Sequence, residues 1–167
     1  MMDVAVRLFD SGPLSLLPAP VRESRRAWLA ILVGVALTLT GSLALSALAS
    51  LFAPTLATPD FALRGTTVFL LLVLFAPLVE TLIMAAVLSV LARFVSPTLA
   101  VLLSAALWGV AHSLQAAAWG LVIWWPFMIF STLYMVWRER SVLAALGVVT
   151  ATHALQNLLP ALKVAFG

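Results

Sequence analysis

The chain has 167 residues, of which 64% are hydrophobic and 9% charged, and its mean hydropathy is +1.18. Soluble domains are roughly 45–50% apolar and about 25% charged. A soluble protein of this length could not bury so much apolar surface in one core, so lipid must surround most of the chain. This composition excludes disorder and a nucleic-acid-binding module, and the absence of cysteine excludes disulfides, thiol nucleophiles and Cys-ligated zinc.

Charges and prolines divide the chain into five apolar runs, at residues 28–52, 66–92, 98–118, 121–137 and 141–162. At a rise of 1.5 Å per residue, each run is long enough to cross a hydrocarbon core about 30 Å thick, the fourth only barely. Because lipid cannot satisfy backbone polar groups, each run must be a helix. Pro77, in the middle of the second run, donates no N–H and predicts a kink or tilt there.

The fold class that follows is all-α: a polytopic helical membrane protein with about five transmembrane helices around an intramembrane polar site. We expect residues 27–167 to form a single transmembrane helical domain and residues 1–26 to form a cytoplasmic N-terminal tail. The first run is long for a signal peptide and is read as an uncleaved anchor.

Basic residues are distributed unequally between the two sides of the predicted helices. Seven lie on one side, namely Arg7, Arg22, Arg25, Arg26, Arg93, Arg138 and Arg140, and two on the other, Arg64 and Lys163. The positive-inside bias therefore predicts a cytoplasmic N-terminus, in a multi-pass protein expected in a bacterial inner membrane. Tryptophans near run ends are interpreted as interfacial anchors: Trp28, Trp119, Trp124, Trp125 and Trp137.

Three ionisable groups lie inside the predicted spans at nearly one depth. Glu80 is the single formally charged residue inside a span, and both histidines, His112 and His153, are also inside spans. Counted from the cytoplasmic end of its run, Glu80 lies 13 residues deep, His153 lies 13 deep and His112 lies 15 deep, or roughly 20–22 Å along the helix axes. A shared site formed by the second, third and fifth helices would explain this coincidence, because an isolated acid in lipid costs at least a few kcal/mol.

Further groups accompany the histidines at helical spacing. Asn157 follows His153 by four residues and therefore shares its helix face, and Trp108 precedes His112 by the same interval. Gly109 allows another backbone to approach closely.

This set of residues is sufficient for peptide hydrolysis by water. Glu80 with an imidazole can polarise a water molecule, and His153 and Asn157 can donate hydrogen bonds to the oxyanion that forms. The chain lacks an HExxH helix, a pair of membrane aspartates and a nucleophile elbow. A zinc ion held by Glu80, His112 and His153 is the alternative to a cofactor-free site.

Three short motifs carry a family resemblance: APLVE at 76–80, WGVAH at 108–112 and HALQN at 153–157. In this order they resemble the CAAX-protease and bacteriocin-processing (CPBP) intramembrane proteases, over residues 66–162. That family shows Pro-x-x-Glu-Glu-x-x-x-Arg in its first motif, where this chain has Thr81 in place of the second Glu and Ala85 in place of the Arg.

The resemblance implies a glutamic-type intramembrane protease in which Glu80 and His112 activate water while His153 and Asn157 form the oxyanion hole. It implies a peptide or protein substrate associated with the lipid bilayer, and no nucleic acid partner. Because of Thr81 and Ala85, a catalytically inactive member that acts as a binding, scaffold or immunity protein is the second hypothesis. A proton or ion pathway is disfavoured, since residues 70–75 and 82–87 supply no polar route.

Overall fold

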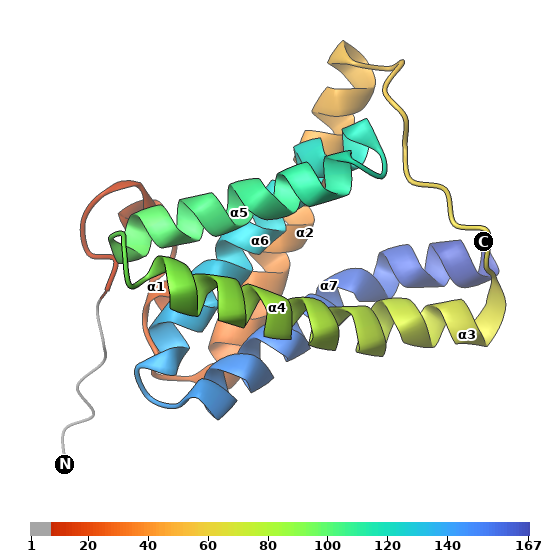
Figure 1. The fold of residues 1–167 in the computed structure, drawn as a ribbon. Coiled ribbons are helices and arrows are strands. Elements are labelled where there is room, and N and C mark those ends of the chain that lie inside the picture. The colour runs from red at the N-terminus through yellow and green to blue at the C-terminus, as the bar shows by residue number, and fades with distance from the viewer. Residues whose placement is uncertain (1–7) are drawn as a thin grey trace.

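The computed structural model describes residues 8–167, and every regular element in that range is a helix (Figure 1). Arg7 and the first part of the predicted tail lie outside the described residues. In chain order the elements are η1 (Pro13–Leu16), α1 (Ala19–Arg22), α2 (Ala27–Phe52), α3 (Gly65–Leu70), η2 (Leu71–Phe75), α4 (Ala76–Leu91), α5 (Pro97–Ser113), α6 (Ala117–Arg138) and α7 (Val142–Phe166).

Four helices are long and apolar enough to cross a membrane: α2, the continuous helix Gly65–Leu91 formed by α3, η2 and α4, then α6 and α7. The predicted polytopic helical membrane fold is thereby confirmed. The third apolar run forms a shorter helix than predicted, because α5 ends at Ser113 rather than at residue 118. The N–H groups of Gln115 and Ala116 both bond to the carbonyl of His112, which closes the helix in a tight turn before α6 begins.

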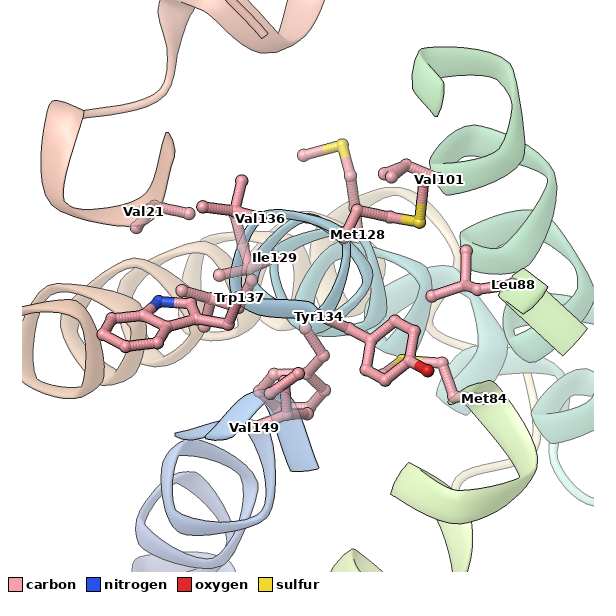
Figure 2. Packing of buried hydrophobic residues seen from close by; sticks show 14 of the residues in the cluster. Val21, Met84, Leu88, Val101, Met128, Ile129, Tyr134, Val136, Trp137 and Val149 are labelled. Carbon is pink, nitrogen blue, oxygen red and sulfur yellow. The ribbon is translucent and has the colours of Figure 1, made fainter. Parts of the chain in front are cut away.

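Helix α6 is the centre of the bundle. In its most apolar stretch 67% of the residues are buried, against 17 to 33% in the other three long helices. It contacts α2, α4, α5 and α7, and its side chains point outward in several directions into the core, with Ile129, Tyr134 and Val136 among them (Figure 2). The outer helices instead expose leucine and phenylalanine side chains, as expected for surfaces that face acyl chains.

Small residues let the helices approach closely. A Cβ added to Gly120 on α6 would collide with the carbonyl oxygen of Gly109 and the hydroxyl of Ser113, both on α5. On the other side of α6, the indole of Trp125 lies against Gly41 of α2, and its Nε1 donates a hydrogen bond of 2.8 Å to the carbonyl of Leu37. These contacts are the small-residue helix packing and interhelical hydrogen bonding typical of membrane bundles.

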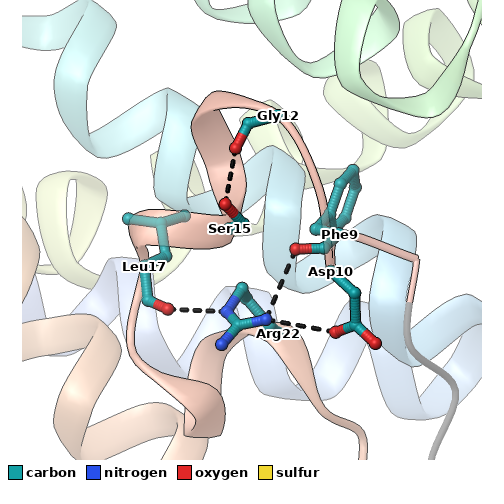
Figure 3. A network of polar contacts seen from close by, with 6 residues as sticks. All are labelled: Phe9, Asp10, Gly12, Ser15, Leu17 and Arg22. Atoms are coloured by element: carbon teal, nitrogen blue, oxygen red, sulfur yellow. Dashed lines mark hydrogen bonds and ion pairs between the residues drawn. The ribbon is translucent and has the colours of Figure 1, made fainter.

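Residues 8–26 fold against the bundle instead of extending away from it. Phe9 and Val21 are completely buried, and α1 contacts both α6 and α2. The guanidinium of Arg22 donates to the carbonyls of Leu17 (2.6 Å) and Phe9 (3.3 Å) (Figure 3). The same group pairs with Asp10 at 3.2 Å. The buried side chains of this segment belong to the same hydrophobic core as α6, so the segment covers one end of the helices.

The tryptophans only partly follow the predicted anchoring role. Trp28 is 60% exposed, as an interfacial anchor requires, but Trp137 is only 5% exposed and belongs to the core. The prediction is wrong for Trp137. The sequence places this residue at the end of an apolar run, but the folded segment 8–26 and the neighbouring helices cover that end of α6.

The tight crossing of α5 and α6 makes a prediction about two glycines. Gly120→Ala should lower the thermal midpoint, because the added methyl group must push α5 away from α6, at a cost of about 1–3 kcal/mol. Gly147→Ala is the matched control: it lies inside α7 with nothing within 4 Å of the added carbon, so it should be neutral or stabilising by up to about 1 kcal/mol. Thermal unfolding in detergent measures both, and equal behaviour of the two variants would contradict the packing described.

Candidate active site

The helix Gly65–Leu91 contains one π-helical turn, η2, directly before Pro77. Proline has no N–H, and its ring clashes with the carbonyl four residues earlier, which here belongs to Val73. The hydrogen-bond ladder shifts accordingly, and the N–H of Ala76 bonds to the carbonyl of Leu71, five residues back. The distortion predicted at Pro77 therefore takes the form of a π-turn, a feature that often accompanies functional sites.

Glu80, His112, His153 and Asn157 all line one cavity of about 610 Å³. They come from α4, α5 and α7, the second, third and fifth of the apolar runs. The expectation that these helices turn their polar groups toward a common interior is confirmed.

The carboxylate of Glu80 faces His153. Its Oε2 lies 3.6 Å from Nε2 of the imidazole, within range of an ion pair. The side chain of Glu80 keeps 26% of its surface exposed, whereas that of His153 keeps 5%. Glu80 is therefore accessible from the cavity, whereas His153 is almost completely buried in the cavity wall.

His112 is oriented by its own helix. Its Nδ1 lies 2.9 Å from the backbone carbonyl of Trp108, one turn earlier. A carbonyl oxygen only accepts hydrogen bonds, so Nδ1 carries the proton, and Nε2 of the neutral ring is left with its lone pair. The spacing of four residues between Trp108 and His112 is thus what fixes this tautomer.

Aromatic rings from α6 hold both imidazoles. Phe130 stacks on His153, with ring centroids 4.5 Å apart, and Trp119 meets His112 edge-on at 4.6 Å. Phe127 touches both histidines and stacks on Trp108 at 4.2 Å. Phe127 and Phe130 were not predicted to have this role, and Trp119 was predicted to be an interfacial anchor. The available signal was the three-residue spacing of Phe127 and Phe130, which places them on one helix face.

The side-chain amide of Asn157 bonds to the backbone of the helix opposite. Its Nδ2 donates a hydrogen bond of 3.0 Å to the carbonyl of Leu72, inside the π-turn η2. Asn157 therefore joins α7 to the segment that leads into Glu80.

One end of the cavity carries charged residues. Asp60 and Arg64, from the segment between α2 and α3, line the same cavity as Lys163 near the end of α7. Figure 1 shows the start of α3 beside the C-terminal end of α7, and Phe69 contacts Phe166 there. The cavity thus extends along α7 from the buried histidine toward a charged mouth.

A second cavity, of about 650 Å³, adjoins the first. It lies between the C-terminal half of α2 and helices α6 and α7, and its lining is largely apolar. Trp119, Gln156 and Pro160 belong to the walls of both cavities. Lys163 lines both cavities as well, and Gln156 is buried, so its amide is the buried polar group of this shared wall.

The residues of the site do not form a metal-binding group in this structure. Among residues 8–167, no three His, Cys, Asp or Glu side chains are grouped so as to hold a metal ion. Glu80, His112 and His153 share the cavity without the convergence that a catalytic zinc ion requires of its three protein ligands. No chemical step is therefore assigned to a metal.

The two departures from the CPBP motif lie in the protein interior. Thr81 is 1% exposed and Ala85 is 8% exposed. A charged residue at either place would be buried, so the neutral pair leaves no ion to be compensated. The hydroxyl oxygen of Thr81 has no hydrogen-bond partner among the described residues.

An acid and two imidazoles around a cavity inside apolar helices define a membrane-embedded protein with a site suited to hydrolysis. The chain matches the family model described as type II CAAX prenyl endopeptidase Rce1-like, over residues 62–159, which is more than half of its length. It therefore belongs to the Rce1-like family, in agreement with the CPBP resemblance, and all four site residues lie in the matched region. No curated protein and no solved structure matches the chain. Family membership points to a peptide hydrolase of membranes that acts on a peptide or protein substrate.

Because the chain has no native cysteine, single-cysteine labelling can test whether the cavity holds water. Glu80→Cys should react with a charged, water-soluble methanethiosulfonate, since thiols react as thiolates and these form only where water reaches. Leu82→Cys is the control on the same helix: Leu82 is 48% exposed but does not line the cavity, so it faces lipid and should remain unlabelled. Equal labelling of the two variants would contradict a wet cavity at Glu80.

Proposed function

We propose that the protein is an intramembrane endopeptidase that hydrolyses a peptide bond with water activated by Glu80 and His112. The observation that carries the proposal is the shared cavity, which brings the single intramembrane acid and both histidines of the chain together. Intramembrane ionisable groups are costly and mark functional sites by default. The family match supports the reaction class.

The geometry supports distinct roles for the two sides of the site. The unprotonated Nε2 of His112 and the carboxylate of Glu80 are bases that line the cavity, and together they would take one proton from water as its oxygen attacks the carbonyl carbon of the peptide. His153 and Asn157, on α7, would donate hydrogen bonds to the oxyanion. When the C–N bond breaks, the proton that Glu80 and His112 took from water passes to the leaving amine nitrogen.

The proposed substrate is a membrane-associated peptide or protein with an apolar segment, and the first probe is a C-terminal peptide with a prenylated cysteine. The family description supplies this substrate class. The apolar cavity next to the site is a second support, because it offers room for a hydrocarbon chain beside the reacting groups. A fluorogenic CAAX-type peptide, with and without a farnesyl group, tests the assignment: cleavage of the farnesylated form alone or by preference is expected, and cleavage of neither form would contradict it.

An inactive protein that binds a partner is the second candidate function. It is favoured by Thr81 and Ala85, which replace the second Glu and the Arg of the family motif. Under this hypothesis the polar groups serve to join helices, and replacing them should lower stability. Under the proposed function, replacement of Glu80 or His112 should cost little stability or even increase it.

Substitution of the two bases separates these hypotheses. Glu80→Gln and His112→Ala should each lower kcat by about 100-fold or more, because general acid–base catalysis contributes on this scale, while the thermal midpoint stays equal or rises. Glu139→Gln is the matched control, since Glu139 lies beyond the end of α6, where its carboxylate pairs with Arg138 at 3.4 Å, and should not change turnover. Near-normal turnover by Glu80→Gln would contradict the proposed function.

Removal of metal tests the zinc alternative. Because the described residues contain no metal-holding group, turnover in detergent should be unchanged after prolonged dialysis against a strong chelator. Loss of turnover that added zinc restores would contradict the metal-free assignment and favour Glu80, His112 and His153 as zinc ligands.

A further inference from the structure

We propose that Pro77 is a positioning residue for Glu80: it imposes the π-turn η2, which turns the carboxylate into the cavity and frees a backbone carbonyl that Asn157 then binds. The inference rests on the proposed function in one respect, that Glu80 is the catalytic acid. Its structural part, the coupling of Pro77 to Asn157, is independent of any activity.

The π-turn leaves the carbonyl of Leu72 without a backbone donor. In an α-helix the carbonyl of Leu72 would accept from the N–H of Ala76, but that N–H bonds to Leu71 instead. In the π register the donor to Leu72 would be residue 77, and proline has no N–H. The carbonyl of Leu72 is therefore left without a helical donor in either register.

A side chain of another helix, α7, donates a hydrogen bond to this carbonyl. The Nδ2 of Asn157 lies 3.0 Å from the oxygen of Leu72. Lipid offers no donor, so only a protein group or water in the cavity that Leu72 lines can satisfy this carbonyl, and Asn157 is the protein group in place. Asn157 and Pro77 thus form one arrangement, since the asparagine binds the group that the proline leaves free.

The π-turn also determines the helix face on which Glu80 lies. Leu72, Ala76 and Glu80 all line the cavity, at intervals of four residues. In an unbroken α-helix these positions would drift by about 80° over eight residues, because successive residues are about 100° apart. The wider π-turn absorbs this drift and keeps the three residues in one line. Without it, Glu80 would rotate away from the wall that holds His153.

The hydrogen bond to Leu72 also explains how Asn157 can serve the oxyanion. An amide nitrogen carries two N–H groups in one plane. One is committed to Leu72, which fixes the plane, and Asn157 also lines the cavity. A donor held in this way needs no reorganisation when negative charge develops on the substrate.

Pro77→Ala tests the positioning role. The substitution restores the missing N–H and lets the helix become regular, so kcat on the farnesylated probe should fall about tenfold or more with KM little changed. The thermal midpoint should stay equal or rise, because a proline inside a helix is replaced by the best helix former. Leu78→Ala, at the adjacent lipid-exposed position outside the cavity lining, is the control and should retain turnover. A kcat within twofold of the native protein would overturn the positioning role.

A thermal double-mutant cycle tests the coupling without any substrate. Asn157→Ala should lower the thermal midpoint in the native background, because the carbonyl of Leu72 loses its donor. The same substitution should lower it much less in the Pro77→Ala background, where the regular helix lets the N–H of Ala76 donate to that carbonyl. Equal loss in both backgrounds would overturn the coupling. If Glu80→Gln kept full turnover, the proposed function would fail, yet this cycle would still decide whether Pro77 and Asn157 act together.

Discussion

An ionised side chain in lipid is strongly disfavoured unless it is paired or solvated, and this cost explains how the helices are arranged around Glu80. Glu80 lies well inside an apolar helix, where an isolated carboxylate is strongly disfavoured. The protein meets this cost by setting the carboxylate 3.6 Å from His153 and beside a cavity of about 610 Å³ that also receives His112. Such an arrangement needs several helices to converge at one depth, and the central, largely buried α6 makes this possible by contacting all of them.

The same rule applied to the backbone explains the second layer of the site. A proline inside a membrane helix leaves carbonyl groups that lipid cannot satisfy, so another part of the protein or water in a cavity must do so. Here Asn157 binds the carbonyl of Leu72, and the π-turn before Pro77 sets the face on which Glu80 emerges. The pairing of Glu80 with His153 and the bond from Asn157 to Leu72 therefore have the same cause, which is that lipid cannot solvate polar groups.

The sequence was sufficient to predict the features that depend on solvent and helical period. These are the apolar helices, the distortion at Pro77 and the convergence of Glu80 with the two histidines. It was insufficient for features set by tertiary packing. Phe127 and Phe130 appear as ordinary apolar residues until His153 lies against them, and Trp137 resembles an interfacial anchor until other segments cover it. An asparagine in a membrane helix indicates an interhelical hydrogen bond, but the sequence does not show that the acceptor of Asn157 is the carbonyl of Leu72.

Solid-state NMR measures how close the carboxylate of Glu80 lies to an imidazole inside the membrane domain. The protein in bilayers would carry ¹³C at Glu Cδ and ¹⁵N at His Nε2, a small set because the chain has three glutamates and two histidines. Because Oε2 of Glu80 lies 3.6 Å from Nε2 of His153, a measurable ¹³C–¹⁵N dipolar coupling between these two residues is expected, and it should disappear in His153→Phe. The absence of any such coupling in the native protein would contradict the contact between Glu80 and His153.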